Sequence, residues 1–171
     1  ISILNAAICK ANHLIWLQGQ ENPEWHEMGT TITAAVINKK QLSVANVGDS
    51  SLYMFRNGKL KKITRDHTLA EKMVADGLLK NEEKKSSGYN HILTRALGIQ
   101  EEVVIDNFEH QLYEGDLVLL CSDGLTDMLD DNEIETILNQ EENLQKSLNI
   151  LLDTALTKGG YDNITIILLR I

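Results

Sequence analysis

Apolar residues recur every three to four positions over the first part of the chain. This spacing is that of one face of an α-helix, so residues 2–18 are predicted to form an amphipathic helix. Similar signals predict three more helices, at 66–79, from Glu133 onward and at 143–157. Asp131 or Asn132 is the predicted cap of the helix that begins at Glu133. The segments between these helices contain shorter apolar runs without the helical spacing.

Short runs rich in apolar and β-branched residues, separated by turn residues, are predicted as strands. They lie at 30–38, 41–47, 51–56, 59–64, 103–109, 117–121 and 163–169. The first four are predicted to form an antiparallel meander, in which Asn57-Gly58 is a strong hairpin signal. The run at 117–121 is apolar throughout, which is typical of a strand buried on both faces. Strands in hairpin order, with helices before and after them, predict an α+β fold with antiparallel sheet.

The composition is that of an ordinary globular protein and argues against several classes of function. A length of 171 residues, with 43% hydrophobic and 24% charged residues, suits one domain. The net charge of −9 argues against nucleic-acid binding, which needs a basic surface. No apolar run reaches the roughly 18 residues of a membrane span. Cys9 and Cys121 lie in apolar runs, so both are expected to be buried, reduced thiols in a cytoplasmic protein.

Three aspartates lie at the ends of predicted strands. Asp123 follows the run at 117–121 after one serine, Asp162 directly precedes the last strand, and Asp49 lies between two strands. Each is within two residues of a glycine, which allows close approach of the backbone. Carboxylates fixed in this way suit hard cations such as Mg²⁺ or Mn²⁺. Ordinary turns also use Asp-Gly and Asp-Asn pairs, so the pattern by itself leaves both interpretations open.

Six short stretches decide between these interpretations. They are MGTT at 28–31, ANVGDS at 45–50, TRDH at 64–67, LTRALG at 93–98, LCSDGLTD at 120–127 and GGYDNIT at 159–165. Each stretch is weak alone, but the set resembles, in order and spacing, the protein phosphatase 2C family of metal-dependent protein serine/threonine phosphatases. The compact bacterial members are the most similar.

The resemblance implies a fold, a cofactor and an activity. The fold is a sandwich of two antiparallel sheets flanked by helices. Asp123 and Asp162 would hold a binuclear Mg²⁺ or Mn²⁺ centre, Asp49 would join a third and weaker metal site, and Asn163 would orient Asp162. The activity is hydrolysis of phosphoserine and phosphothreonine on proteins that a serine/threonine kinase has modified. The polar segment 67–91 resembles the variable flap of the family, whose Lys72, Lys80, Lys84 and Lys85 could attract phosphoproteins.

The sequence also departs from the family pattern. The first strand motif and the DGxGG motif, whose Asp bridges both metals, do not occur in residues 1–171. We therefore expect a single domain of this type that lacks its N-terminal third and is inactive by itself. Ser51 stands where the family often has Arg. The alternative function is a non-catalytic regulatory or pseudo-phosphatase interaction module on the same fold. A nucleotide-binding domain is disfavoured because no GxxxxGK[ST] or GxGxxG loop is present.

Overall fold

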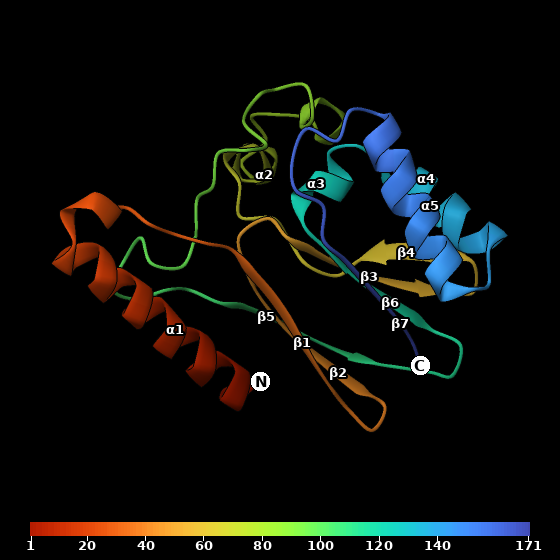
Figure 1. The fold of residues 1–171 in the computed structure, drawn as a ribbon, viewed down its shortest axis with the longest axis horizontal. Helices are drawn as coiled ribbons and strands as arrows, with labels where there is room; N and C mark the ends of the chain where they lie inside the picture. The colour runs from red at the N-terminus through yellow and green to blue at the C-terminus, as the bar shows by residue number, and fades with distance from the viewer. The chain divides into compact units, whose positions relative to one another are not determined.

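The computed structural model describes all residues 1–171, which form two compact units. The first unit comprises Ile1–Asp49 and Arg65–His110, and the second comprises Ser50–Thr64 and Gln111–Ile171. The first contains a three-stranded sheet in the order β1-β2-β5, and the second a four-stranded sheet in the order β4-β3-β6-β7 (Figure 1). Every strand pairing that is defined by its register is antiparallel.

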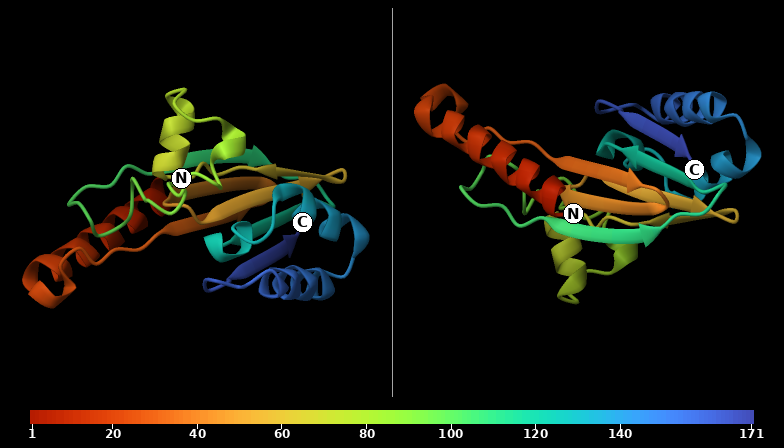
Figure 2. Two further views of the ribbon diagram at one scale, coloured as in Figure 1. Left: turned by 90° about the horizontal axis from the view of Figure 1, so that it is seen from above. Right: turned by 90° about the horizontal axis from the view of Figure 1, so that it is seen from below.

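The first unit packs one long helix against its sheet. Its elements are α1 (Ser2–Glu21), η1 (Pro23–Trp25), β1 (Ile32–Asn38), β2 (Gln41–Val47), α2 (Leu69–Ala75), η2 (Asn81–Glu83) and β5 (Asp106–Gln111). The N-terminal end of α1 lies beside the sheet in both views of Figure 2. Ile8 on α1 forms a buried cluster with Ala45 and Val47 on β2 and with Leu97. None of the helices in the structure is both long enough and apolar enough to span a lipid bilayer.

The second unit packs its helices onto the β3 and β6 strands. Its elements are β3 (Ser51–Arg56), β4 (Lys59–Lys62), β6 (Leu117–Cys121), α3 (Asp123–Thr126), α4 (Asp131–Gln140), α5 (Leu144–Thr157) and β7 (Ile166–Arg170). Leu119 on β6 is fully buried in one cluster with Leu125, with Ile134 on α4 and with Leu151 on α5. The continuous apolar run at 117–121 is therefore an inner strand of its sheet, and four of its five residues are buried, as the prediction of a buried strand requires.

The α+β class and the antiparallel sheets are confirmed, and β2, β3 and β6 have the predicted bounds. The four-stranded meander is wrong, because β2 pairs with β1 and β5 whereas β3 pairs with β4 and β6. The chain leaves the first sheet at Gly48, which has a φ of 109° that a strand cannot continue. The hairpin at Asn57-Gly58 is confirmed, with φ of 51° and 76° at its two residues.

Several predicted bounds need correction. The helix expected at 66–79 begins only at Leu69, because the Thr68 side chain caps it by accepting a hydrogen bond from the Glu71 amide. Helix α4 begins at Asp131, and its cap is Asp130 rather than Asp131 or Asn132. β5 and β7 each begin three residues later than predicted. Cys121 is buried as expected, but Cys9 is exposed because α1 turns its neighbour Ile8 toward the sheet.

A partly buried ion pair joins the end of β3 to the start of β6. Arg56 donates from Nε to Asp116 Oδ1 at 2.8 Å and from Nη2 to Asp116 Oδ2 at 2.7 Å, and the Asp116 side chain is only 2% exposed. The Tyr113 amide also donates to Oδ2, at 2.7 Å. The hydrogen bond from Arg56 lowers the pKa of Asp116, although burial opposes this effect. The folded state therefore holds Asp116 as a carboxylate.

We expect Asp116→Asn to lower the free energy of unfolding at pH 7 by about 2–3 kcal/mol, since it removes a charge-assisted pair and leaves Arg56 without its carboxylate partner. Because the folded pKa of Asp116 lies below the unfolded one, its contribution is complete above the unfolded pKa and disappears as pH falls through the folded pKa. The variant should thus lose less stability than the wild type between pH 7 and pH 3. Urea unfolding at both pH values measures this.

The control is Asp153→Asn, an exposed position on α5 with the same change in charge. If Asp116→Asn is as stable at pH 7 as this control, the pair contributes nothing to stability.

Candidate metal centre

Two of the three predicted metal ligands lie in the second unit, at neighbouring strand ends. Asp123 is the first residue of α3, which is separated from β6 by Ser122 alone, and is half-buried. Asp162 is exposed and precedes β7, and its Oδ1 accepts a hydrogen bond of 2.6 Å from the Asn163 amide. The backbone amide of Asn163 therefore contacts the Asp162 carboxylate, and a role of the Asn163 side chain in orienting it stays a prediction.

The backbones that carry these two aspartates are in direct contact. The Ser122 amide donates to the Thr165 carbonyl at 3.1 Å, and Ser122 Oγ accepts from the Thr165 amide at 3.0 Å. Ser122 Oγ also donates to the Asn163 carbonyl, at 3.1 Å. A Cβ atom at Gly124 would lie only 2.4 Å from the same carbonyl oxygen. Ser122 and Gly124 are thus needed for the close approach of the two segments.

A further carboxylate, which the sequence analysis did not assign, accompanies Asp123. Asp127 follows it by four residues, and its carboxylate offers an oxygen within 4.8 Å of an Asp123 oxygen. The Asp127 amide donates to the Asp123 carbonyl at 2.8 Å, which is a helical contact. Like charges at this spacing repel each other, and a divalent cation relieves the repulsion. The Asp-x-x-x-Asp spacing at a predicted strand end was the signal that could have identified Asp127.

Asp49, the third predicted ligand, lies in the first unit, in the turn after β2, and is half-buried. Gly48 sets the position of this turn, because its φ of 109° is strained for any other residue and a Cβ atom there would lie 2.3 Å from the Thr31 side chain. The Gly48 carbonyl accepts from Asn46 Nδ2 at 3.2 Å, and its amide donates to His67 Nδ1 at 3.0 Å. The backbone next to Asp49 is therefore held in place.

The flap lysines differ in what they contact. Lys84 forms an ion pair with Glu71 at 2.5 Å, and Arg65 donates to the other Glu71 oxygen at 3.1 Å. Partial burial raises the pKa of Glu71, but the hydrogen bonds from Lys84 and Arg65 outweigh it and lower the pKa overall. Lys72 lines a cavity of about 410 Å³ together with Arg65 and Arg95. Lys84 is therefore part of a structural pair, and attraction of phosphoproteins by the flap stays a prediction.

Comparisons with known proteins agree on one family. The family described as protein phosphatase 2C matches residues 4–73. A serine/threonine phosphatase, Stp of Listeria welshimeri, is 36% identical over 167 residues, which are 98% of this chain and 66% of the relative. The solved structure of the serine/threonine phosphatase PstP/Ppp of Mycobacterium tuberculosis is 34% identical with a TM-score of 0.94, over 100% of this chain and 72% of that one.

A second solved structure adds a metal. It is the catalytic domain of the serine/threonine protein phosphatase PstP in complex with two manganese ions, and it is 34% identical with a TM-score of 0.88, over 98% of this chain and 70% of that one. Residues 1–171 thus span slightly less than two thirds of the Listeria relative and about 70% of the solved domains. The fold of this chain is therefore similar to that of solved phosphatase domains.

We expect Gly124→Ala to lower the free energy of unfolding by about 3 kcal/mol, because the new methyl group would press on the Asn163 carbonyl. The amide resonances of Asn163 and Thr165 should shift, since their contacts with Ser122 must open. Denaturant unfolding and ¹H–¹⁵N spectra measure the two effects.

Gly115→Ala in the same unit is the matched control. Gly115 has nothing within 4 Å of an added Cβ but has a φ of 89°, so only the backbone penalty of about 1–2 kcal/mol remains. Equal costs for the two variants, with unmoved Asn163 and Thr165 resonances in both, would show that the contact at Gly124 has no steric role.

Proposed function

Since the chain belongs to the protein phosphatase 2C family, we propose that its protein is a metal-dependent phosphatase that hydrolyses phosphoserine and phosphothreonine on proteins. One observation carries the proposal: the backbones on which Asp123 and Asp162 lie are in direct contact. Such a contact holds the two segments that carry these carboxylates side by side.

We assign Asp123 and Asp162 to a centre of two Mn²⁺ or Mg²⁺ ions and Asp49 to a third, weaker site. The donor set fits, because hard divalent cations prefer carboxylate oxygens and the Asp123–Asp127 pair already places two such oxygens within 4.8 Å. The two manganese ions in the PstP domain support a centre of two ions. When bound, a pair of divalent ions supplies an acidified water and neutralises the charge of the phosphoryl oxygens.

The residues of the chain itself contribute by positioning the carboxylates that would hold the ions. The Asn163 amide holds Asp162 Oδ1, so this carboxylate is oriented before any ligand binds. Ser122 bridges the two segments through its hydroxyl group, which accepts from one residue and donates to another. Hydrolysis of a phosphate monoester depends mostly on positioning and electrostatics, so this pre-formed geometry is the chain's main catalytic resource.

The substrates would be proteins modified by a serine/threonine kinase, and the compartment would be the cytoplasm. The printed names of the relatives support the first statement, since they are serine/threonine phosphatases. The two cysteines support the second, because both are free thiols in the structure. The net charge of −9 fits a partner other than nucleic acid.

We expect the full-length natural protein to hydrolyse p-nitrophenyl phosphate and phosphothreonine peptides when Mn²⁺ or Mg²⁺ is present, and to lose this activity after chelation. Asp123→Asn and Asp162→Asn should each lower kcat by about 10²–10³-fold, because each removes several kcal/mol of charge stabilisation. Steady-state kinetics over a range of Mn²⁺ concentrations measure the loss. Asp153→Asn is the control and should keep full activity.

Two outcomes would contradict the proposal. Activity that survives exhaustive chelation would remove the metal requirement, and a fully active Asp123→Asn at saturating Mn²⁺ would remove that ligand. A folded protein that binds the phosphopeptide without turnover would favour the non-catalytic interaction module instead.

A further inference from the structure

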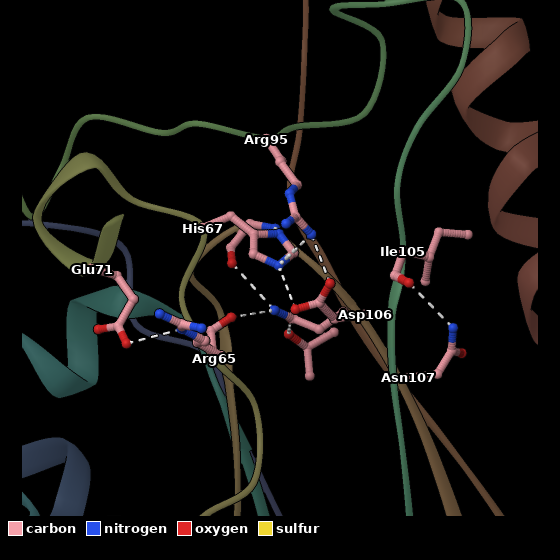
Figure 3. Close-up of polar contacts among 10 residues, drawn as sticks. Arg65, His67, Glu71, Arg95, Ile105, Asp106 and Asn107 are labelled. Atoms are coloured by element: carbon pink, nitrogen blue, oxygen red, sulfur yellow. Dashed lines mark hydrogen bonds and ion pairs between the residues drawn. The ribbon is translucent and has the colours of Figure 1, made fainter. Parts of the chain in front are cut away.

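His67 is a buried residue of the first unit whose two ring nitrogens both have partners. It is 5% exposed, its Nδ1 lies 3.0 Å from the Gly48 amide, and its Nε2 lies 3.1 Å from Asp106 Oδ2 (Figure 3). An amide N–H can only donate, so Nδ1 must carry the lone pair, and the proton of the neutral ring is on Nε2. His67 therefore accepts from Gly48 and donates to Asp106.

Arg95 completes this network by binding the second carboxylate oxygen of Asp106. Its Nη1 donates to Asp106 Oδ1 at 2.6 Å. The same atom lies 3.1 Å from His67 Nε2, but two donors form no hydrogen bond, so Arg95 acts on the carboxylate. Partial burial raises the pKa of Asp106, yet the hydrogen bonds from His67 and Arg95 outweigh burial and lower it overall. Asp106 is thus an ionised acceptor that fixes the imidazole.

The backbone of Gly48 is held at both of its polar groups. Its amide donates to the His67 ring, and its carbonyl accepts from the His67 amide at 3.0 Å and from Asn46 Nδ2 at 3.2 Å. His67 is in turn held by the Thr94 amide, which donates to its carbonyl at 2.7 Å. We call the two contacts of His67 with the Gly48 backbone the clamp. Because Gly48 directly precedes Asp49, any movement of this clamp moves the backbone of Asp49.

We propose that His67, oriented by Asp106, is a positioning residue that sets the affinity of the cation site to which Asp49 contributes. The cation site rests on the proposed function, whereas the clamp on Gly48 rests on the contacts given above. His67 touches neither substrate nor metal in this role and acts only through the Gly48–Asp49 backbone. Partners of this kind commonly change metal affinity by 10–100-fold.

Two substitutions of His67 by an amide residue distinguish the contributions of its two ring nitrogens. In His67→Asn, the amide oxygen can take the place of Nδ1 and accept from Gly48, while the donor to Asp106 is lost. In His67→Gln, the amide nitrogen can take the place of Nε2 and donate to Asp106, while the acceptor for Gly48 is lost. The two variants bury similar polar groups, so they differ mainly in which contact they keep.

The test measures Mn²⁺ binding to the full-length natural protein by isothermal titration and by the electron paramagnetic resonance of free Mn²⁺. The Asp49-dependent ion is defined as the one lost in Asp49→Asn. We expect His67→Gln to lower the affinity for this ion by about tenfold, and His67→Asn to lower it by about threefold or less. In the Asp49→Asn background, His67→Gln should have no further effect, since it acts through Asp49. Circular dichroism checks that each variant is folded.

A measurement on the wild type needs no variant. Long-range ¹H–¹⁵N spectra should show the neutral His67 ring with its proton on Nε2, and the Gly48 amide should be protected from hydrogen exchange. A proton on Nδ1 would overturn the clamp whatever the metal does.

The remaining outcomes separate this proposal from the proposed function. Equal weakening by His67→Gln and His67→Asn, or an effect that persists in the Asp49→Asn background, would show a general structural role and overturn the proposal. Normal Mn²⁺ binding by His67→Gln would overturn the proposal alone. A folded wild type that binds no Mn²⁺ would overturn the metal assignment and this proposal with it.

Discussion

The contact between the Gly124 backbone and the Asn163 carbonyl is the constraint on which the candidate site depends. It can form only because residue 124 has no Cβ atom, and because Ser122 satisfies the polar groups of the opposite segment. β6 and β7 pair in register up to Cys121 and Ile166, so the sheet delivers both segments to this contact. The sheet thus fixes where Asp123 and Asp162 leave it, and the contact at Gly124 fixes how closely their backbones approach.

The first unit also contains a close backbone contact at a glycine that polar side chains complete. Gly48 takes a backbone conformation and a close approach to Thr31 that other residues would strain, and its polar groups are held by Asn46 and His67. In both places a glycine permits the contact and a polar side chain completes it. The reason is physical: a turn that presents a carboxylate must leave the sheet, and backbone groups that leave a ladder need other partners.

The sequence predicted those parts of the fold that local residues determine. The bounds of β2, β3 and β6 follow from apolar runs that end at turn residues, and the Asn57-Gly58 hairpin follows from two residues that tolerate positive φ. The start of β5 could not be read locally, because Val104 belongs to an apolar run yet is 67% exposed outside the sheet.

Strand pairing between distant parts of the chain was the second feature that the sequence did not predict. The change of sheet between β2 and β3 depends on the pairing of β3 with β6, where Ser51 meets Cys121. No local pattern records a partner so far along the chain, and for this reason the meander was wrong. Asp123, Asp162 and Asp49 were identified from the sequence as candidate ligands, whereas Asp127 and the His67–Gly48 contact needed the structure, since they depend on which side chains face each other.

Two sets of acidic residues in the chain differ in how their charge is balanced. Asp116 is paired with Arg56, Asp106 with Arg95, and Glu71 with Arg65 and Lys84, so the fold itself neutralises these carboxylates. Asp123 and Asp162 form no ion pair with Lys or Arg in the structure, although both lie on constrained backbone. A carboxylate that is held in place but not neutralised by the chain keeps its lone pairs for another cation, and it is this difference, more than the number of acids, that makes these two positions candidates for metal binding.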